Sequence, residues 1–409
     1  MLPVENGDNF LIKERKNPKI CGIAGNMRMI KRLIKIYKTV SLILLNTLLL
    51  FIFLNLFLQL LIVLFEDKVP KGSMHFGMET LKEVYPNLSE KDILTLGHET
   101  WYNQEFTYEP YTQFRRKAQK GEFLNIHEEG FRYIQDQCSY PVNKSNYNIF
   151  LFGGSAAFGY GVGDNDTIAS RIQHRLRNNY NFTNVCVYNF GRSSYFSIQE
   201  GILLQNLIRK NQIPDMSIYI DLLNDYNDPD SQPKFTPQLS DYIAGKNRVI
   251  NALSELPVTR IGVYLISNKD RPLIKGKEEL TGITQTYFIN KKIIESVSKG
   301  FGIKTYFVIQ PTPLYKYNLS NHIVYNKYPH ILNITMNGKL GYEILREQYD
   351  KFDFNDRKNI IWLVDMQENK SENLYVDSDH YNPVFSDEIA GEIVKSIKNS
   401  IHSRQSARK

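Results

Sequence analysis

The chain has 409 residues, of which 42% are hydrophobic and 23% are charged, and this globular balance excludes disorder as the dominant state. Its three cysteines are too few for a disulfide-rich scaffold or for a cysteine-rich zinc module. The net charge of +7 is concentrated in residues 1–38, so the nearly neutral remainder lacks the basic surface that nucleic-acid binding needs, and we expect no nucleic-acid partner.

Residues 1–38 form a basic segment with nine Lys or Arg and three Asp or Glu side chains. The 27 residues that follow, 39–65, carry no charge and are mostly Leu, Ile, Phe and Val. As a helix they extend roughly 40 Å, more than the roughly 30 Å hydrocarbon core of a bilayer, so the sequence predicts a transmembrane helix. A cleavable signal peptide is the alternative, but its apolar core is shorter and ends in small residues, whereas this one ends Leu64-Phe65-Glu66-Asp67.

The charges that flank this apolar segment predict its orientation. Basic residues cluster before it, whereas the twenty residues after it contain only Lys68, Lys71 and Lys82. The positive-inside bias therefore predicts a single-pass membrane protein with a cytosolic N-terminus and an extracytoplasmic domain over residues 66–409. The lipid bilayer is the partner expected for residues 39–65.

The remaining chain divides into a lead-in and an α/β pattern. Residues 66–147 are a polar, aromatic-rich lead-in or stalk with short helices predicted at 78–84 and 91–101. Strands are then predicted at 148–153, 184–189, 216–221, 303–310 and 359–364, and helices at 166–179, 197–210, 284–299, 338–351 and 383–400. This alternation predicts one domain over residues 148–400, with a parallel sheet covered by helices on both faces. Residues 222–283 form an insertion in it, and residues 401–409 form a basic tail.

A serine lies at a glycine-rich turn directly after the first predicted strand, in the sequence Gly153-Gly154-Ser155-Ala156-Ala157. No lysine follows Gly159, which excludes a phosphate-binding P-loop, and Ala157 takes the last position of the lipase pattern G-x-S-x-G. Ligands bind at the carboxyl ends of parallel strands. Ser155 is therefore a candidate nucleophile, and a turn-forming serine is the alternative.

Groups that can assist a nucleophilic serine follow the later strands. Gly191 follows the second strand and can offer its backbone N–H, and Asn224 follows the third and can offer its amide. Near the C-terminus, Asp377 precedes His380 by three residues, a spacing that lets a carboxylate orient an imidazole. These positions predict one polar site at a common edge of the sheet.

Three further acidic residues lie beside these groups. Asp379 is a rival partner for His380, although the spacing favours Asp377. Asp221 and Asp225 are expected to be structural caps or hydrogen-bonding groups at the rim. No histidine has the spacing of a known metal motif, so we expect neither a metal nor a cofactor.

Residues from about 120 to 400 resemble the SGNH (GDSL-type) hydrolase superfamily. The residues that match its blocks are Gly154 and Ser155 in the first, Gly191 in the second, Asn224 in the third, and Asp377 with His380 in the fifth. Residues 125–132 also resemble the lead-in of membrane-anchored members. Two positions depart from the pattern, because Gly154 replaces the usual aspartate and Leu222 stands where glycine is common. The resemblance implies a flavodoxin-like three-layer sandwich with a five-stranded parallel sheet in the order 2-1-3-4-5.

The same resemblance implies an activity, namely acyl transfer by a serine nucleophile. It assigns Ser155 as the nucleophile, His380 as the base, Asp377 as the residue that orients the ring, and Ser155, Gly191 and Asn224 as the oxyanion hole. The predicted protein is a membrane-anchored esterase for an acylated small molecule or glycan, with O-acetyl groups of a cell-envelope or secreted glycan favoured. A glycan O-acetyltransferase and a non-catalytic envelope-polymer assembly protein with a degenerate hydrolase fold are the alternatives.

Two further predictions concern the exported part. Tyr226, Tyr242 and Tyr264 of the insertion could stack on sugar rings, or could equally pack on their own domain. Cys138 and Cys186 could form a disulfide in an oxidising compartment, although their positions in the sequence leave this open.

Overall fold

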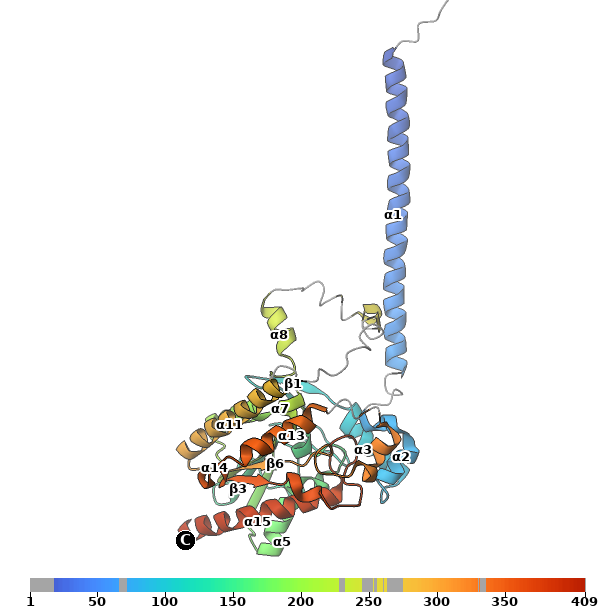
Figure 1. The fold of residues 1–409 in the computed structure, drawn as a ribbon. Helices are drawn as coiled ribbons and strands as arrows, with labels where there is room; N and C mark the ends of the chain where they lie inside the picture. The colour runs from blue at the N-terminus through green and yellow to red at the C-terminus, as the bar shows by residue number, and fades with distance from the viewer. Residues whose placement is uncertain are drawn as a thin grey trace, which may run out of the picture. The chain divides into compact units, whose positions relative to one another are not determined.

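The computed structural model divides the chain into two compact units (Figure 1). The first contains residues 1–66 and 249–268, and the second contains residues 67–248 and 269–409. The residues that the structure describes are 18–65, 72–227, 232–244, 253, 256–259, 261–262, 275–329, 331 and 336–408.

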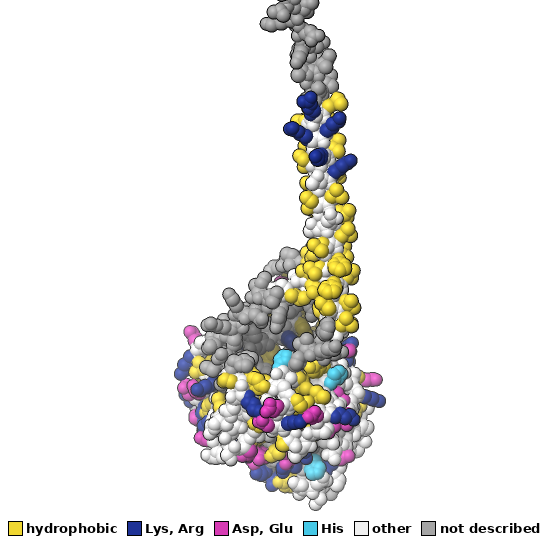
Figure 2. All heavy atoms as spheres, turned by 90° about the vertical axis from the view of Figure 1, so that its right-hand side faces the viewer, with side chains coloured by type: hydrophobic (Ala, Val, Ile, Leu, Met, Phe, Trp, Pro, Cys, Tyr) yellow, Lys and Arg dark blue, Asp and Glu magenta, His cyan; other side chains and the backbone are white. Residues whose placement is uncertain are grey.

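One long helix, α1 (Pro18–Phe65), dominates the first unit. Its stretch Met27–Leu64 is long and apolar enough to cross a membrane, by length and composition. Hydrophobic side chains such as Leu44 and Leu50 are exposed along it, while Lys and Arg gather toward its N-terminal end (Figure 2). An apolar surface of this size on a single helix is typical of a segment that contacts lipid. The prediction of a helix over residues 39–65 is confirmed, and the helix extends further toward the N-terminus.

The second unit is built on a five-stranded parallel sheet, as predicted. Its strands are β3 (Tyr147–Gly153), β4 (Val185–Asn189), β5 (Met216–Asp221), β6 (Lys304–Ile309) and β7 (Ile360–Trp362). They are arranged β4-β3-β5-β6-β7, which is the predicted order 2-1-3-4-5. Almost every residue of β3, β4 and β5 is buried, because both faces of a parallel sheet are covered.

Helices cover both faces and complete three layers (Figure 1). The larger ones are α5 (Ile168–Tyr180), α6 (Ser197–Arg209), α11 (Lys277–Gly300), α13 (Met336–Tyr349) and α15 (Pro383–Arg408). Alternate residues of β3 face opposite layers, because side chains of a strand alternate. Ile149 packs in the cluster with α5 and α15, whereas Phe150 packs in the cluster with α6 and α11.

Two helices exceed their predicted lengths. Helix α11 begins at Lys277, seven residues before the predicted start, and Glu278 and Glu279 in its first turn stabilise that end of the helix dipole. Helix α15 continues to Arg408, through residues that sequence analysis assigned to a separate tail, because nothing after residue 400 breaks a helix.

The lead-in packs against the sheet domain. Its elements are η2 (Gly72–Phe76), α2 (Gly77–Val84), α3 (Glu90–Gly97), η3 (His98–Tyr102), β1 (Phe106–Glu109) and β2 (Gln113–Arg116). The two predicted helices are present, whereas the antiparallel pair β1–β2 was not predicted because its four-residue strands give little periodic signal. Leu81 and Leu96 form one buried cluster with Val162 and Val376, so this segment contributes to the core.

Shorter helices connect the main elements. They are α4 (Ser155–Phe158), η4 (Asp164–Asp166), α7 (Leu223–Asn227), α8 (Thr236–Ile243), η5 (Leu319–Asn321), α12 (Ile323–Lys327), α14 (Phe354–Arg357) and η7 (Val364–Gln367).

A disulfide joins the lead-in to the sheet. Cys138 and Cys186 are bonded, with their Cα atoms 5.8 Å apart and a sequence separation of 48. Cys186 lies on β4, so the bond links this edge strand to the loop before β3. The pairing that the sequence left open is present.

We predict that Cys138→Ser lowers the free energy of unfolding of the second unit by about 2–4 kcal/mol, because the bond closes a long loop in the unfolded chain. Urea unfolding of the detergent-solubilised full chain, followed by tryptophan fluorescence, measures the change. Cys21→Ser is the matched control, since Cys21 lies outside this unit. Three free thiols in the denatured, unreduced protein, rather than one, would contradict the pairing.

Candidate active site

The turn after β3 places Ser155 at the carboxyl edge of the sheet. Gly153 ends the strand with a φ of +145°, and a Cβ atom there would lie 2.4 Å from the carbonyl oxygen of Ile220. Glycine is therefore required at this position. Ser155 begins α4 and is partly exposed, and its hydroxyl has no hydrogen-bond partner among the residues that the structure describes.

A buried arginine holds the loop that follows Ser155. Arg132 is 0% exposed and donates to the carbonyl oxygens of Phe158 (3.0 Å), Gly159 (2.6 Å) and Val162 (2.7 Å). Its Nε also donates to the carboxylate of Asp164 at 2.8 Å. These contacts satisfy the guanidinium and fix the backbone of residues 158–162.

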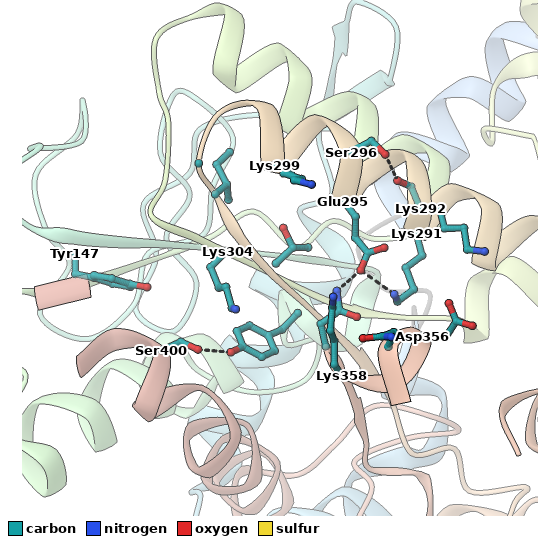
Figure 3. Close-up of a pocket in the computed structure, with 16 residues that line it drawn as sticks. Tyr147, Lys291, Lys292, Glu295, Ser296, Lys299, Lys304, Asp356, Lys358 and Ser400 are labelled. Carbon is teal, nitrogen blue, oxygen red and sulfur yellow. Dashed lines mark hydrogen bonds and ion pairs between the residues drawn. The ribbon is translucent and has the colours of Figure 1, made fainter. Parts of the chain in front are cut away.

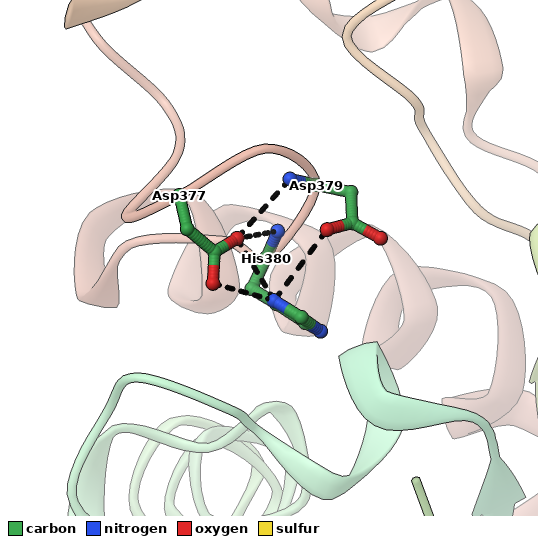
Figure 4. A group of neighbouring side chains, drawn as sticks. All are labelled: Asp377, Asp379 and His380. Atoms are coloured by element: carbon green, nitrogen blue, oxygen red, sulfur yellow. Dashed lines mark hydrogen bonds and ion pairs between the residues drawn. The ribbon is translucent and has the colours of Figure 1, made fainter. Parts of the chain in front are cut away.

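Asp377 and His380 form a buried pair on the loop before α15 (Figure 4). Nδ1 of His380 lies 2.8 Å from both carboxylate oxygens of Asp377, and 3.6 Å from Oδ1 of Asp379. The backbone N–H groups of Asp379 and His380 also donate to Asp377. Asp377 is thus the closer partner, and its backbone bonds orient it toward the imidazole.

The surroundings of this pair shift the pKa values of both His380 and Asp377. Burial lowers the pKa of His380, but the carboxylates of Asp377 and Asp379 outweigh burial and raise that pKa to about 9. Burial acts to raise the pKa of Asp377, but the charge of His380 holds it below its usual value. The pair therefore favours an imidazolium beside a carboxylate.

Aromatic contacts join the His380 loop to the Ser155 turn. The ring of His380 lies 5.4 Å from that of Tyr160 and 5.8 Å from that of Trp101, measured between centroids. Gly161, in the same turn as Tyr160, packs against Val376 so closely that a Cβ atom would lie 2.6 Å from it. Nε2 of His380 is buried and has no hydrogen-bond partner in the described part of the chain, so no hydrogen bond yet joins it to Ser155.

Asn224 lies beside the same turn. Its Nδ2 donates to the carbonyl oxygen of Tyr195 at 2.7 Å, and lies only 2.3 Å from the position of a Cβ atom on Gly154. A side chain at position 154 would therefore displace this amide, which explains the glycine found in place of aspartate. Leu222, the second departure, adopts a φ of +106°, a conformation that glycine adopts without strain.

Gly191 lies in a place where only glycine fits, but its backbone N–H does not make the contact that the sequence predicts. A Cβ atom there would lie 2.5 Å from the backbone nitrogen of Phe158, so only glycine fits. Its N–H, expected to face an oxyanion, donates instead to Oδ1 of Asn189 at 3.0 Å. Gly191 has only this one N–H, whereas the Asn224 amide has a second N–H besides the one that it donates to Tyr195.

Three buried acids lie behind Asn224, and sequence patterns identified only two of them. Asp225 accepts from the backbone N–H of Ser197 at 3.4 Å and from its hydroxyl at 2.6 Å, at the start of α6, which agrees with a capping or hydrogen-bonding role. Burial raises the pKa of Asp225 to about 7 and that of Asp221 to about 6. Burial and the charge of Asp221 raise the pKa of Glu200 well above its usual value.

The tyrosines of the insertion differ from one another. Tyr226 is 0% exposed, packs on Tyr342 and shares a hydrogen bond with Thr284, so it cannot stack on a sugar ring. Its side chain is apolar enough to join the core when the hydroxyl is satisfied. Tyr242 on α8 is exposed. Tyr264 lies outside the described residues.

The Asp377 loop also brings together atoms that could contact a cation. One ligand atom each of Asp377, Asp379 and His380 lies within 4.8 Å of the others. Nδ1 of His380 already bonds Asp377, so a cation would compete with this pair.

A separate cavity of about 860 Å³ lies at the other ends of the strands from Ser155 (Figure 3). Tyr147 and Lys304, which begin β3 and β6, line it together with lysines of α11. Because parallel strands share one direction, this cavity lies at their amino ends, away from Ser155.

The chain matches no protein-family model and no curated protein. Among solved structures, it is similar to the psychrotrophic esterase EstA from Pseudoalteromonas sp., with 13% identity, a TM-score of 0.34, and coverage of 63% of this chain and 100% of that one. An acetyl xylan esterase is 12% identical, with a TM-score of 0.36 and coverage of 61% and 99%. A putative lipolytic protein of the G-D-S-L family from Desulfitobacterium hafniense is 11% identical, with a TM-score of 0.36 and the same coverage. At these values the fold assignment rests on the sheet topology.

We predict that the pKa values of two buried histidines are shifted in opposite directions. His380 has its pKa raised to about 9, whereas burial lowers the pKa of His322 to about 4. Because the folded pKa of His380 exceeds its usual value of 6.5, its protonation stabilises the fold at low pH, and this contribution is lost as pH rises through about 9. NMR of ¹³C-labelled histidine should show a protonated His380 and a neutral His322 at pH 7, with His380→Gln for assignment. A His380 signal that titrates below pH 6.5 would contradict the ion pair.

Proposed function

We propose that this protein is a membrane-anchored serine esterase in which Ser155 attacks the ester, His380 accepts its proton and Asp377 orients the imidazole. The observation that carries this proposal is the Asp377–His380 pair, whose free Nε2 lies on a loop packed against the Ser155 turn. Catalytic hydrogen bonds often close only with substrate bound, so the open Nε2 is compatible with a base.

The reaction proceeds in two balanced steps. Oγ of Ser155 forms a bond to the acyl carbon while its proton passes to Nε2 of His380, and the proton then leaves with the alcohol when the ester C–O bond breaks. A water molecule next attacks the acyl-serine and gives a proton to His380. His380 then returns this proton to Oγ of Ser155 as the acyl–oxygen bond breaks, which releases the acid and the free serine. Asp377 stabilises the imidazolium that forms in each step.

Two donors remain for the oxyanion that develops on the acyl carbonyl. The Asn224 amide gives one N–H to Tyr195 and leaves its second for the substrate, next to Gly154. The backbone N–H of Ser155 is the other. Gly191 contributes only if Asn189 releases its N–H. Each donor of this kind contributes typically on the order of 10²–10³ in kcat.

The proposed location is the extracytoplasmic face of a membrane, with α1 as the anchor and the basic N-terminus in the cytosol. The Cys138–Cys186 disulfide supports this, because such bonds persist in oxidising compartments. Acetyl esters of an envelope or secreted glycan are then the proposed substrates, since these polymers share that compartment.

We predict that Ser155→Ala reduces hydrolysis of p-nitrophenyl acetate by at least about 10³-fold and abolishes labelling by a fluorophosphonate, because both need the activated hydroxyl. Ser193→Ala is the matched control and should retain both. Undiminished turnover in Ser155→Ala would refute the assignment. A wild-type chain that resists the fluorophosphonate would instead favour a non-catalytic envelope protein.

We also predict that kcat/KM rises with pH along a limb with an apparent pKa near 9, since only the neutral imidazole of His380 accepts a proton. Asp379→Asn should move this limb to lower pH and keep most of the activity, because Asp379 adds to the raised pKa without orienting the ring. Asp387→Asn, on α15 and paired with Arg175, is the control. A limb that stays in place in Asp379→Asn would show that Asp379 does not tune the base.

A further inference from the structure

One polar residue of α1 is shielded where its neighbours are exposed. Asn55 is 8% exposed, whereas the adjacent Leu56 is 67% exposed. Leu58 and Ile62, which lie three and seven residues further on and therefore on the same helix face, are also partly shielded. This pattern marks one stripe of the helix as a contact surface.

A segment from the insertion contacts this stripe. The backbone N–H of Val258 donates to Oδ1 of Asn55 at 3.2 Å, while Nδ2 of Asn55 donates to the carbonyl oxygen of Phe51 at 2.8 Å. Pro257 is buried and Leu256, Val258 and Thr259 are partly buried. Residues 249–268 belong to the same compact unit as α1, although about 200 residues of chain separate them.

The contact gives a hydrogen-bond partner to two polar groups, Oδ1 of Asn55 and the backbone N–H of Val258, that lipid could not pair. An amide side chain and a backbone N–H each cost several kcal/mol when they face hydrocarbon without a hydrogen bond. Asn55 and Val258 satisfy one another, and the residues beside them supply an apolar contact. The bond therefore suits a position at or near the edge of the hydrocarbon core.

The length of the apolar segment gives the depth of this contact. Asn55 lies 16 residues beyond Thr39, or roughly 24 Å along a helix, and the roughly 30 Å core then ends near residue 59. If the core instead ended at Phe65, Asn55 would lie roughly 15 Å inside it. The sequence carries a charged residue directly before and directly after the segment 256–259, and a charge near the centre of a bilayer has a high cost.

We propose that the outer boundary of the hydrocarbon core lies near Gln59, and that residues 256–259 dock on the outer end of α1, at the edge of this core, through Asn55. The insertion is then a second attachment to the membrane surface, in addition to the direct connection after Phe65. The proposal rests on the proposed orientation of α1, but not on esterase activity.

Crosslinking in native membranes tests the docking. In a Cys21→Ser full chain, Asn55→Cys with Val258→Cys should react with a short bifunctional thiol reagent at least about tenfold faster than Leu56→Cys with Val258→Cys. The control pair lies at the same depth but on the exposed face of the helix. Equal rates in the two pairs would overturn the docking, and retained p-nitrophenyl acetate turnover would show that the esterase assignment stands regardless.

Labelling with a membrane-impermeant maleimide tests the boundary. In intact cells Val63→Cys should be labelled and Leu48→Cys should not, because only the former lies outside the core. Protection of both in cells and in inverted vesicles would overturn the boundary near Gln59. Labelling of Val63→Cys in inverted vesicles alone would overturn the proposed orientation, and with it the membrane face to which the segment is assigned.

Discussion

The candidate site depends on one buried arginine, Arg132. The guanidinium of Arg132 is wholly buried and holds three carbonyl oxygens of the loop that follows Ser155, together with the carboxylate of Asp164. Removing one partner of such a pair typically costs about 3–5 kcal/mol, because it leaves a buried charge without compensation. This loop carries Tyr160, against which the His380 ring packs. The position of the imidazole therefore depends on Arg132, through the loop that Arg132 holds.

Packing, more than direct hydrogen bonding, brings the candidate site together. Val376 and Gly161 join the His380 loop to the Ser155 turn, and the lead-in completes this contact with Trp101 and with Tyr85, whose hydroxyl donates to Gly161 at 2.9 Å. The lead-in is therefore part of the same folded unit as the sheet. A truncation that removes the lead-in would therefore remove the Trp101 and Tyr85 contacts that help to position the imidazole of His380.

A strained backbone residue and three buried carboxyl groups lie close to Asn224 in the structure. Leu222 has a φ of +106°, and Glu200, Asp221 and Asp225 have raised pKa values because burial disfavours their charged forms. Raised carboxyl pKa values mean that the folded state loses stability as pH rises from the usual carboxyl range toward neutrality. Such features recur at functional sites, where a rigid surrounding structure maintains them.

The sequence by itself determined the long apolar helix, the alternation of strands and helices, the strand order implied by the SGNH resemblance, and the chain positions of Ser155, Asn224, Asp377 and His380. These follow from local periodicity and motif spacing, which a chain carries without folding. Only the tertiary structure decided that the Gly191 N–H is engaged by Asn189, that Tyr226 is buried, that Cys138 pairs with Cys186, and that Glu200 lies against Asp221. Each of these joins residues from different elements, so each depends on distances that exist only once the sheet and its helices have packed.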